Sequence, residues 1–280
     1  MSFILSIGER SHRGYVRDVN EDAVVVSSPV FAVADGMGGH DSGEIASRIT
    51  ATILEGLGRE GPYTRGGVLN ALDLANRMIP QETGGDLPAG TTVVGMVLSS
   101  EGSFGFNVGD SRIYRFHRGE MTQLSTDHSV VQELIDRGSI TEQEAAKHLR
   151  RNVVTRAVGV EDEIEVDVFS IEASVGDRYL LASDGLTGEV NDARISEILR
   201  SETEADSAAQ IMLDEALANG GRDNISILIV DVIGSKEDSE ASETSDTNKR
   251  RGSRRSGDTT RKTRRQIPVT LGPIDSGADG

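Results

Sequence analysis

The sequence predicts an α+β protein, a two-layer antiparallel β-sandwich flanked by helices on its outer faces. Nine strand-like runs alternate with two groups of helical segments, and no internal repeat is present. Glycine-containing hairpin signals such as HRGE (117–120) and VGDR (175–178) join several neighbouring runs. A chain of this length with so many strands folds into two packed layers, and its helices cover the outer faces.

The expected strands are short runs of apolar or alternating residues. In chain order they are FILSIG (3–8), AVVVSS (23–28), VFAVA (30–34), TTVVGMVL (91–98), SFGFNV (103–108), RIYRFHR (112–118), IEVDVFSI (164–171), RYLLAS (178–183) and NISILIVDV (224–232). β-branched and aromatic residues dominate these runs, as is typical of half-buried or buried strands.

Helical periodicity is clearest at 41–57, where Ile45, Ile49, Ile53 and Leu57 form one apolar stripe. Asp41 and Glu44 have the spacing of a capping box at the start of this helix. A second helix is expected at 64–80, ending at Pro80, and two more at 192–200 and 205–218.

Composition excludes several kinds of chemistry. The chain has no cysteine, so disulfides, thiolate metal sites and cysteine nucleophiles are absent. No apolar stretch has the length of a membrane span, and the N-terminal residues do not resemble a signal peptide. A cytoplasmic location is therefore expected.

Charge divides the chain into a body and a tail. Ten basic and eight acidic residues follow position 234, which leaves 19 basic and 38 acidic residues in 1–234, a net charge of −19. A body this acidic disfavours nucleic acid and anionic membranes, and it tolerates divalent cations. Residues 235–280 are expected to be a disordered charged tail with a basic cluster at 249–265. The cluster is read either as a solvated linker or as a docking arm for an anionic partner or a membrane surface.

Acidic residues stand at the ends of several expected strands. Asp35 follows VFAVA, Asp110 follows FNVG, Asp184 follows YLLAS, Asp223 precedes NISILIV, and Glu21 and Asp22 precede another strand. Side chains at one end of a sandwich can converge although they are distant in sequence. Clustered carboxylates require either raised pKa values or a cation, and oxygen ligands favour Mg²⁺ or Mn²⁺ over zinc. Asp177, also beside a glycine, is instead read as a hairpin residue.

Eight short motifs occur in an order that resembles the type 2C, metal-dependent Ser/Thr protein phosphatases in their compact bacterial form. They are RDVNED (17–22), VADGMGGH (33–40), GTT (90–92), NVGDSRIY (107–114), TDHS (126–129), TRAVG (155–159), LLASDGLT (180–187) and GGRDNIS (220–226). Each motif alone is weak, but their order over two hundred residues is specific. The resemblance covers about residues 3–233 and implies a phosphatase domain at 1–234.

The resemblance implies two metal ions, Mn²⁺ or Mg²⁺, and possible binding of a third. Asp35 would bridge the first two, the Gly36 carbonyl would bind one of them, and Asp184 and Asp223 would hold the other. Glu21 and Asp22 would complete the set, largely through water. Asp110 with Asp184 matches the third, weaker site, and its alternative reading is a turn aspartate bonded to backbone amides.

The implied reaction is hydrolysis of phosphoserine and phosphothreonine by a metal-bridging hydroxide. Arg17 matches the family's phosphate-binding arginine; the alternative is a surface ion pair with Asp18 or Glu21. The family's animal members carry a histidine, the proposed general acid, at the position of Met37. His40 is therefore a candidate proton donor or a structural residue near a helix start.

Residues 128–156 match a flap that lies beside the metal channel in bacterial members, and two short amphipathic helices separated by Gly138 are expected within it. His148, Arg150 and Arg151 are candidates for contacting phosphopeptide or are simply solvated, while His12, His117 and His128 are read as surface or core residues.

The family implies phosphoproteins as substrates, a cognate bacterial Ser/Thr kinase or an anti-sigma-factor pathway as the setting, and a monomer. The competing functions are a two-metal nuclease, which the acidic body disfavours, and a catalytically inactive phosphoprotein-binding relative, which the complete carboxylate set disfavours.

Overall fold

The computed structural model describes residues 3–38, 41–84, 89–99, 102–145 and 147–235. The strands are β1 (Phe3–His12), β2 (Asp22–Ser27), β3 (Val30–Met37), β4 (Gly90–Thr91), β5 (Val93–Val97), β6 (Ser103–Val108), β7 (Arg112–His117), β8 (Glu120–Gln123), β9 (Asp167–Ile171), β10 (Arg178–Ala182) and β11 (Ile225–Ser235). The helices are α1 (Ser42–Glu60), α2 (Arg65–Glu82), α3 (Val130–Asp136), α4 (Glu142–Ala145), α5 (Asp184–Thr187), α6 (Asp192–Ser201) and α7 (Ala205–Ala218).

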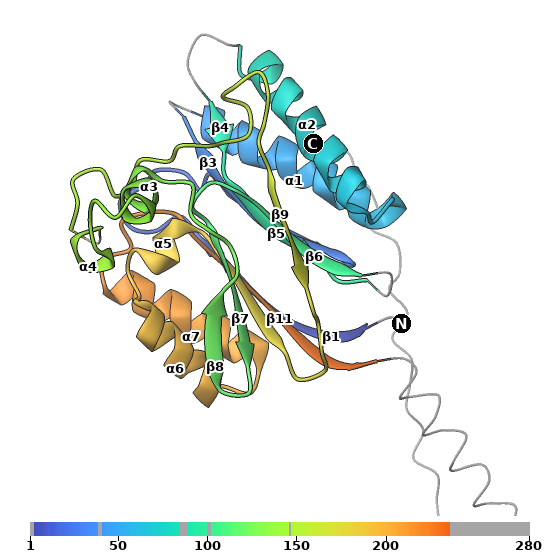
Figure 1. Cartoon of the computed structure of the whole chain (residues 1–280), viewed down its shortest axis with the longest axis vertical. Coiled ribbons are helices and arrows are strands. Elements are labelled where there is room, and N and C mark those ends of the chain that lie inside the picture. The colour runs from blue at the N-terminus through green and yellow to red at the C-terminus, as the bar shows by residue number, and fades with distance from the viewer. Residues whose placement is uncertain (1–2, 39–40, 85–88, 100–101, 146, 236–280) are drawn as a thin grey trace, which may run out of the picture. The chain divides into compact units, whose positions relative to one another are not determined.

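Two antiparallel sheets form the centre of the domain, as the sequence predicts. One sheet has the strand order β1-β11-β10-β7-β8, and the other has the order β2-β3-β5-β6-β9, with β4 paired to β3. Helices α1 and α2 cover the second sheet, and α6 and α7 cover the first (Figure 1). The arrangement confirms the predicted sandwich flanked by helices.

Alternation along the strands explains why the domain has three apolar layers. In β3, Phe31 and Val33 face the other sheet, whereas Ala32 and Ala34 face the helices α1 and α2. In β11, Leu228 and Val230 likewise point between the sheets. The neighbouring Ile227 and Ile229 pack under α6 and α7. Since successive side chains of a strand point to opposite faces, strands buried on both sides read as continuous apolar runs.

The first and last described strands are neighbours. β1 pairs with β11 along its whole length, from Phe3 opposite Ser235 to His12 opposite Ile225. The short loop after β1 and the residues just before β11 therefore meet at the same end of the sandwich. That end also receives the start of β2, the end of β3 and the end of β10.

Two helix-end predictions are wrong in detail. Asp41 precedes α1, but its side chain makes no capping hydrogen bond, because its backbone is not extended as a capping residue requires. The carboxylate of Glu44 instead pairs with Arg48 one turn later. Helix α2 does not end at Pro80 but continues to Glu82, since a proline in the last turn removes only one backbone hydrogen bond there.

Asp177 follows a turn, as predicted, but it does more than shape a hairpin. Its fully buried carboxylate accepts hydrogen bonds from Arg115, from the Tyr179 hydroxyl at 3.0 Å and from the Ser174 backbone N–H at 2.8 Å. Burial opposes its ionisation, but these donors outweigh burial and hold the pKa of Asp177 below its ordinary value.

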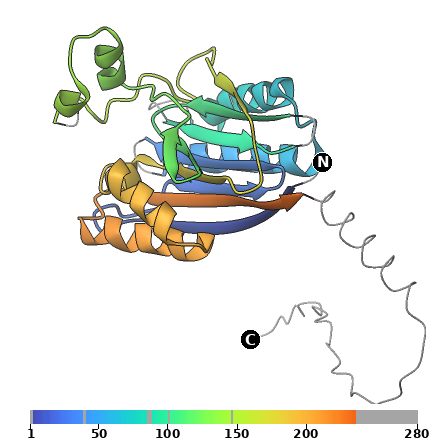
Figure 2. The same ribbon diagram turned by 60° about the horizontal axis from the view of Figure 1, so that its bottom comes forward.

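The flap contains two short helices, α3 and α4, as predicted, and Gly138 between them has φ 69°. Figure 2 shows both helices projecting beyond the sandwich at one end. None of the helices in the described ranges is long and apolar enough to cross a membrane. The predicted tail at 236–280, with its basic cluster, lies outside the described residues.

Candidate active site

Two of the predicted aspartates face each other across neighbouring strands. Asp22 is the first residue of β2, and it stands directly opposite Asp35 near the end of β3. Directly opposed residues of antiparallel strands lie on the same face with their Cα atoms about 4.5–5.5 Å apart. Strand register alone therefore brings these two carboxylates together.

The other sheet supplies Asp184, which begins α5 immediately after β10. Ser183 links the two sheets, because its hydroxyl donates to Asp22 Oδ2 at 2.9 Å and accepts from the Ser226 backbone N–H at 2.9 Å. Asp35 and Asp184 are electrostatic neighbours, since the charge of Asp184 raises the pKa of Asp35. The site thus lies where the open ends of the two sheets meet.

Burial and mutual repulsion disfavour the charged forms of these carboxyl groups. Burial raises the pKa of Asp22 to about 7 and that of Asp184 to about 6, and the charges of neighbouring aspartates add to both shifts. Burial, followed by the charge of Asp22, raises the pKa of Asp35 well above its ordinary value. As whole residues Asp22 and Asp35 are partly exposed, but one carboxylate oxygen of Asp22, Oδ1, is buried.

Asn224 holds the loop that carries Arg17. Its amide nitrogen donates to the carbonyl oxygens of Arg13 and Val19, both at 2.9 Å, and its amide oxygen accepts from the Glu21 backbone N–H at 2.8 Å. One side chain from the start of β11 therefore fixes the loop between β1 and β2.

Arg17 points into the carboxylate cluster from this loop. Its guanidinium pairs with Asp223 Oδ2 at 2.7 Å, so the expected alternative partners, Asp18 and Glu21, are not the ones found. The Arg17 side chain remains 49% exposed, which leaves the guanidinium accessible from outside. It is the cationic side chain that the structure places against the predicted metal ligands.

Gly36 is required because the backbone packs closely at this point. A Cβ atom here would lie 2.2 Å from the Gly43 carbonyl oxygen and 2.5 Å from that of Glu21. The Gly36 N–H donates to the Glu21 carbonyl oxygen at 3.1 Å. The glycine therefore lets β3, the start of α1 and the Glu21 segment meet beside the carboxylates.

Asp110 lies at the edge of the cluster, in the turn between β6 and β7. Burial raises its pKa to about 7, and the charge of Asp184 adds to the shift, so the two carboxylates are electrostatic neighbours. The following Ser111 is buried and hydrogen-bonded to Thr92 at 2.8 Å, which makes this turn rigid.

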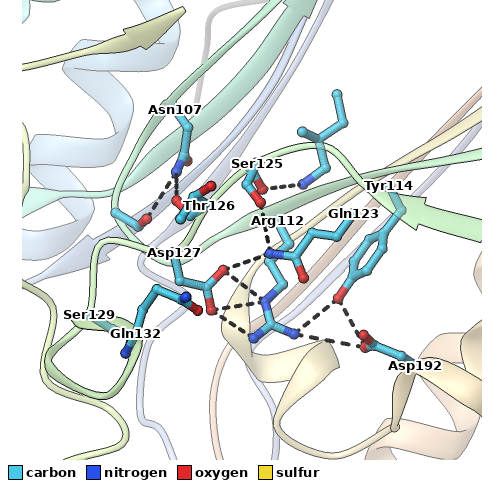
Figure 3. Close-up of polar contacts among 12 residues, drawn as sticks. Asn107, Arg112, Tyr114, Gln123, Ser125, Thr126, Asp127, Ser129, Gln132 and Asp192 are labelled. Atoms are coloured by element: carbon cyan, nitrogen blue, oxygen red, sulfur yellow. Dashed lines mark hydrogen bonds and ion pairs between the residues drawn. The ribbon is translucent and has the colours of Figure 1, made fainter. Parts of the chain in front are cut away.

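Arg112, after the same turn, has a structural role. Figure 3 shows its guanidinium forming a paired contact with Asp127, with distances of 2.7 to 3.0 Å, and a contact with the Tyr114 hydroxyl at 3.1 Å. Tyr114 in turn donates to Asp192 at the start of α6. The network fastens the segment that leads into the flap to β7 and α6.

Two buried carboxylate oxygens of the cluster lack hydrogen-bond partners in the described structure, as expected of a cation site. Glu21 Oε1 and Asp22 Oδ1 are buried oxygens with no hydrogen-bond partner among the described residues. Buried polar atoms without partners are costly, and a cation satisfies carboxylate oxygens directly. The set consists of oxygen donors alone, which suits Mg²⁺ or Mn²⁺.

The side chains are nevertheless not arranged as a finished metal site. Within the described ranges, no three acidic or histidine side chains are positioned to hold one ion. The raised pKa values show that the carboxylates act on each other's charge, so we take them as one cluster. Ligation of one ion by three of these side chains requires that they rotate.

Several residues that hold the site segments in place carry no recognisable signal in the sequence. Ser183 and Asn224 each stand next to a candidate aspartate within a motif, but their sequence context gives them no role, and the same is true of Asp127. The structural reading of Ser111 and Arg112 after Asp110 agrees with their hydrogen bonds. His128 was read as a surface or core residue; it is buried, and its Nδ1 accepts from the Gly109 N–H at 3.0 Å. His40 lies outside the described residues, so its role stays a prediction.

The candidate flap residues are exposed or partly exposed, and in the described structure no ion pair involves His148, Arg150 or Arg151. A separate cavity of about 450 Å³, lined by Arg115, His117 and Arg118 among others, lies at the far end of β7. None of the candidate site residues lines it.

An oxygen-rich carboxylate cluster at the open end of an α-β-β-α sandwich is the arrangement of a metal-dependent hydrolase domain. The family model described as protein phosphatase 2C matches residues 14–225. The chain belongs to the protein phosphatase 2C family.

Named relatives agree with this assignment. The serine/threonine protein phosphatase PstP of Mycobacterium tuberculosis is 38% identical over 240 residues, which cover 83% of this chain and 46% of that protein. The chain therefore spans about half the length of PstP. The serine/threonine phosphatase stp of Listeria innocua is 36% identical over 236 residues, 79% of this chain and 94% of that protein.

A solved structure of the PstP catalytic domain in complex with two manganese ions has a TM-score of 0.74 and 37% identity to this chain. The match covers 83% of this chain and 100% of that one. The similarity extends over nearly all of the described domain.

Proposed function

We propose that this chain is a metal-dependent protein phosphatase that hydrolyses phosphoserine and phosphothreonine in proteins. The observation that carries the proposal is the cluster of buried carboxyl groups from both sheets, with raised pKa values and unpartnered oxygens at Glu21 and Asp22. Membership of the protein phosphatase 2C family supports this reading of the cluster.

The residues that would hold Mn²⁺ or Mg²⁺ are those of the carboxylate cluster. They are Glu21, Asp22, Asp35, the Gly36 carbonyl, Asp184 and Asp223, with Asp110 as the candidate for a further ion. Bound divalent ions supply positive charge to phosphoryl oxygens and lower the pKa of water. The two manganese ions of the PstP structure support this part of the proposal.

Arg17 would bind the phosphoryl group of the substrate. Its guanidinium is half-exposed at the mouth of the cluster and carries the geometry that suits phosphate oxygens. The pair with Asp223 keeps it pointed into the site until substrate arrives. Asn224 fixes the loop beneath it, so little conformational freedom is lost when phosphate binds.

The carboxyl groups would also exchange protons as ions enter. Asp22, with its pKa raised to about 7, is partly protonated at neutral pH without metal, and a cation displaces that proton. Ser183 keeps Asp22 oriented through this change, because its hydroxyl donates to Asp22 Oδ2. His40 remains the candidate donor to the leaving oxygen, since the Met37 side chain has no ionisable proton to donate.

The physiological setting is part of the same proposal. Phosphorylated proteins would be the substrates, and a cognate Ser/Thr kinase would be the opposing enzyme. An anti-sigma-factor pathway is the second candidate setting. We also propose that the enzyme acts in the cytoplasm and as a monomer, and that the basic tail docks an anionic partner.

The test is phosphate release from a phosphothreonine peptide in the presence of manganese, magnesium or a chelator. Asp35→Asn should reduce metal-dependent release by at least roughly 100-fold, the scale of losing one group that stabilises the transition state. Asp73→Asn is the matched control, because Asp73 lies on the outer helix α2 and pairs only with Arg77. No release from the native protein with either metal would reject the proposal and favour a phosphoprotein-binding role.

A further inference from the structure

A groove runs alongside the carboxylate cluster. It has a volume of about 550 Å³ and lies between the ends of β3 and β6, strand β4 and the segment 154–165 that leads from the flap into β9. Met37 lines it two residues after Asp35, and Val108 lines it two residues before Asp110. Two residues of a strand span about 6.6 Å, so the groove lies close to the cluster, although no carboxylate of the cluster lines it.

The packing of the segment 157–165 against β4 forms one side of the groove. A Cβ atom at Gly90 would lie 2.7 Å from Val160 Cγ2 and 2.8 Å from the Val158 carbonyl oxygen. Thr91 and Val158 form a β-bridge just beside this contact. The side of the groove is therefore held by backbone pairing and close packing, and is not an open loop.

The groove is lined by apolar and by acidic side chains. Its buried or partly buried apolar members are Met37, Val108, Val154 and Ile164, which we call the apolar floor. Its exposed acidic members are Glu161, Glu163 and Glu165, which we call the acidic wall.

Most of the acidic charge of this wall is not neutralised by the protein. Arg156 pairs with Glu165 at 3.0 Å and with Asp167 at 3.1 Å. Its single positive charge is therefore shared between these two carboxylates. In the described part of the chain, neither Glu161 nor Glu163 has an ion-pair partner. Only the backbone of Glu161 is engaged, since its carbonyl oxygen accepts from Asn76 at 2.9 Å.

We infer that this groove holds the substrate chain next to the phosphorylated residue, and that Glu161 and Glu163 select a lysine or arginine there. The inference rests on the proposed function and deepens it. A peptide whose phosphoryl group lies at the cluster must continue along the surface, and this groove adjoins the cluster. An extended chain rises about 3.3–3.6 Å per residue, so the selected side chain lies a few residues from the phosphothreonine.

Charge and shape favour this occupant over others. The methylene groups of lysine or arginine would pack on the apolar floor while the cationic head reaches the acidic wall. An acidic peptide would meet two unpaired carboxylates and be repelled. The volume lies in the range of pockets that hold ligands of several side chains' size.

The experiment compares kcat/KM for phosphothreonine peptides that carry arginine, alanine or glutamate at positions flanking the phosphorylated residue. Hydrolysis of p-nitrophenyl phosphate, which has no flanking residues, is measured in parallel. Native protein should prefer the arginine peptides over alanine by roughly two- to fivefold, the scale of exposed ion pairs. The glutamate peptides should be the poorest substrates.

The double variant Glu161→Gln, Glu163→Gln should lose the preference and keep the native rate on p-nitrophenyl phosphate. Glu161→Lys with Glu163→Lys should reverse it in favour of the glutamate peptides. The control is Glu60→Gln with Glu120→Gln, which removes two exposed charges at the last turn of α1 and the start of β8. It should keep the preference.

Three outcomes separate the two proposals. Activity without any charge preference, or a preference that survives in Glu161→Gln, Glu163→Gln, would overturn the groove inference alone. If the control variant Glu60→Gln, Glu120→Gln lost the preference equally, the preference would come from the overall charge of the protein, and the inference would also be overturned. No hydrolysis of any substrate with metal present would reject the proposed function, and the groove inference with it.

Discussion

At the scale of single residues, the central feature is a set of carboxyl groups whose ionisation the fold opposes. Asp22, Asp35, Asp110 and Asp184 have raised pKa values, and burial is the first cause in each case. Without a cation, ionising them costs folding free energy. The same residues that serve function therefore destabilise the metal-free domain at neutral pH.

For Asp22, this argument predicts the direction in which stability changes with pH. Its pKa in the folded protein is about 7, above its ordinary value of 3.8. Stability from the protonated form is fully present below pH 3.8 and is lost as the pH rises to about 7. Asp22→Asn removes the charge but keeps an acceptor for Ser183. We expect this variant, free of metal at pH 8, to be more stable than native protein by about 1 kcal/mol, or roughly 2–4 °C in Tm.

The measurement is thermal unfolding with chelator at pH 5 and pH 8. The gain from Asp22→Asn should shrink at pH 5, where Asp22 is already protonated. Asp73→Asn should show no such pH-dependent gain, because Asp73 is exposed on α2. Equal Tm values for Asp22→Asn and native protein at pH 8 would contradict the argument.

Individual site residues were predictable from the sequence to different degrees. The aspartates could be found because each stands at the end of an apolar run, and strand register then explains the Asp22–Asp35 pair. The Arg17–Asp223 pair and the Ser183–Asp22 hydrogen bond could not, since each joins segments more than 150 positions apart. Such contacts depend on how the two sheets are placed, which local patterns do not encode.

At the scale of elements, helix α1 contains two glycines, one packed against the sheet and one in open space. Gly58 is buried, and a Cβ atom there would lie 2.3 Å from the Ser27 carbonyl oxygen at the end of β2. Gly56 lies in the same helix, and a Cβ atom there would meet no atom within 4 Å. The two glycines therefore have opposite consequences for stability.

We expect Gly58→Ala to destabilise the domain by about 1–3 kcal/mol, because the helix must move away from the sheet. Gly56→Ala should stabilise it by about 0.5–1 kcal/mol, because alanine is the better helix former. Urea unfolding of both variants beside native protein is the measurement. Destabilisation of equal size in both variants would show that close packing at Gly58 is not the cause.

The ends of helices and strands are predicted less well from the sequence than their positions. The nine expected strands and the two flap helices are found. However, β8 (Glu120–Gln123) was not expected, the run 91–98 is divided between β4 and β5, and β1 continues to His12. The capping box at Asp41 failed because the backbone before α1 takes another conformation. Helix α2 continues two residues after Pro80. The hydroxyl of Thr83, which follows the helix, donates to the carbonyl oxygen of Ile79, which precedes the proline.

At the scale of the whole molecule, charge is the dominant long-range property. Residues 1–234 carry a net charge of −19. A field of this sign attracts cations and basic peptides and slows the approach of anionic ones. Composition alone predicts this part of the behaviour, whereas the position of the groove beside the cluster requires the fold.

Salt should therefore weaken the use of basic substrates. Raising the ionic strength from roughly 0.02 M to 0.3 M shortens the screening length well below the size of the domain. We expect kcat/KM for an arginine-containing phosphopeptide to fall several-fold, and that for a neutral peptide of the same length to fall less. Parallel titrations with sodium chloride at fixed manganese concentration measure both. An equal fall for the two peptides would assign the salt effect to the metal site or to phosphate binding.

The pairing of β1 with β11 has a consequence for synthesis on the ribosome. The chain emerges from its N-terminus, so β1 has no partner until residues up to Ser235 have been made. Until then Asn224 is also missing from the loop of Arg17, and Asp184 and Asp223 have no sheet to hold them in place. An unfinished nascent chain therefore carries no assembled hydrolytic centre. Under the proposed function, a nascent chain would therefore have no phosphatase activity before its domain is complete.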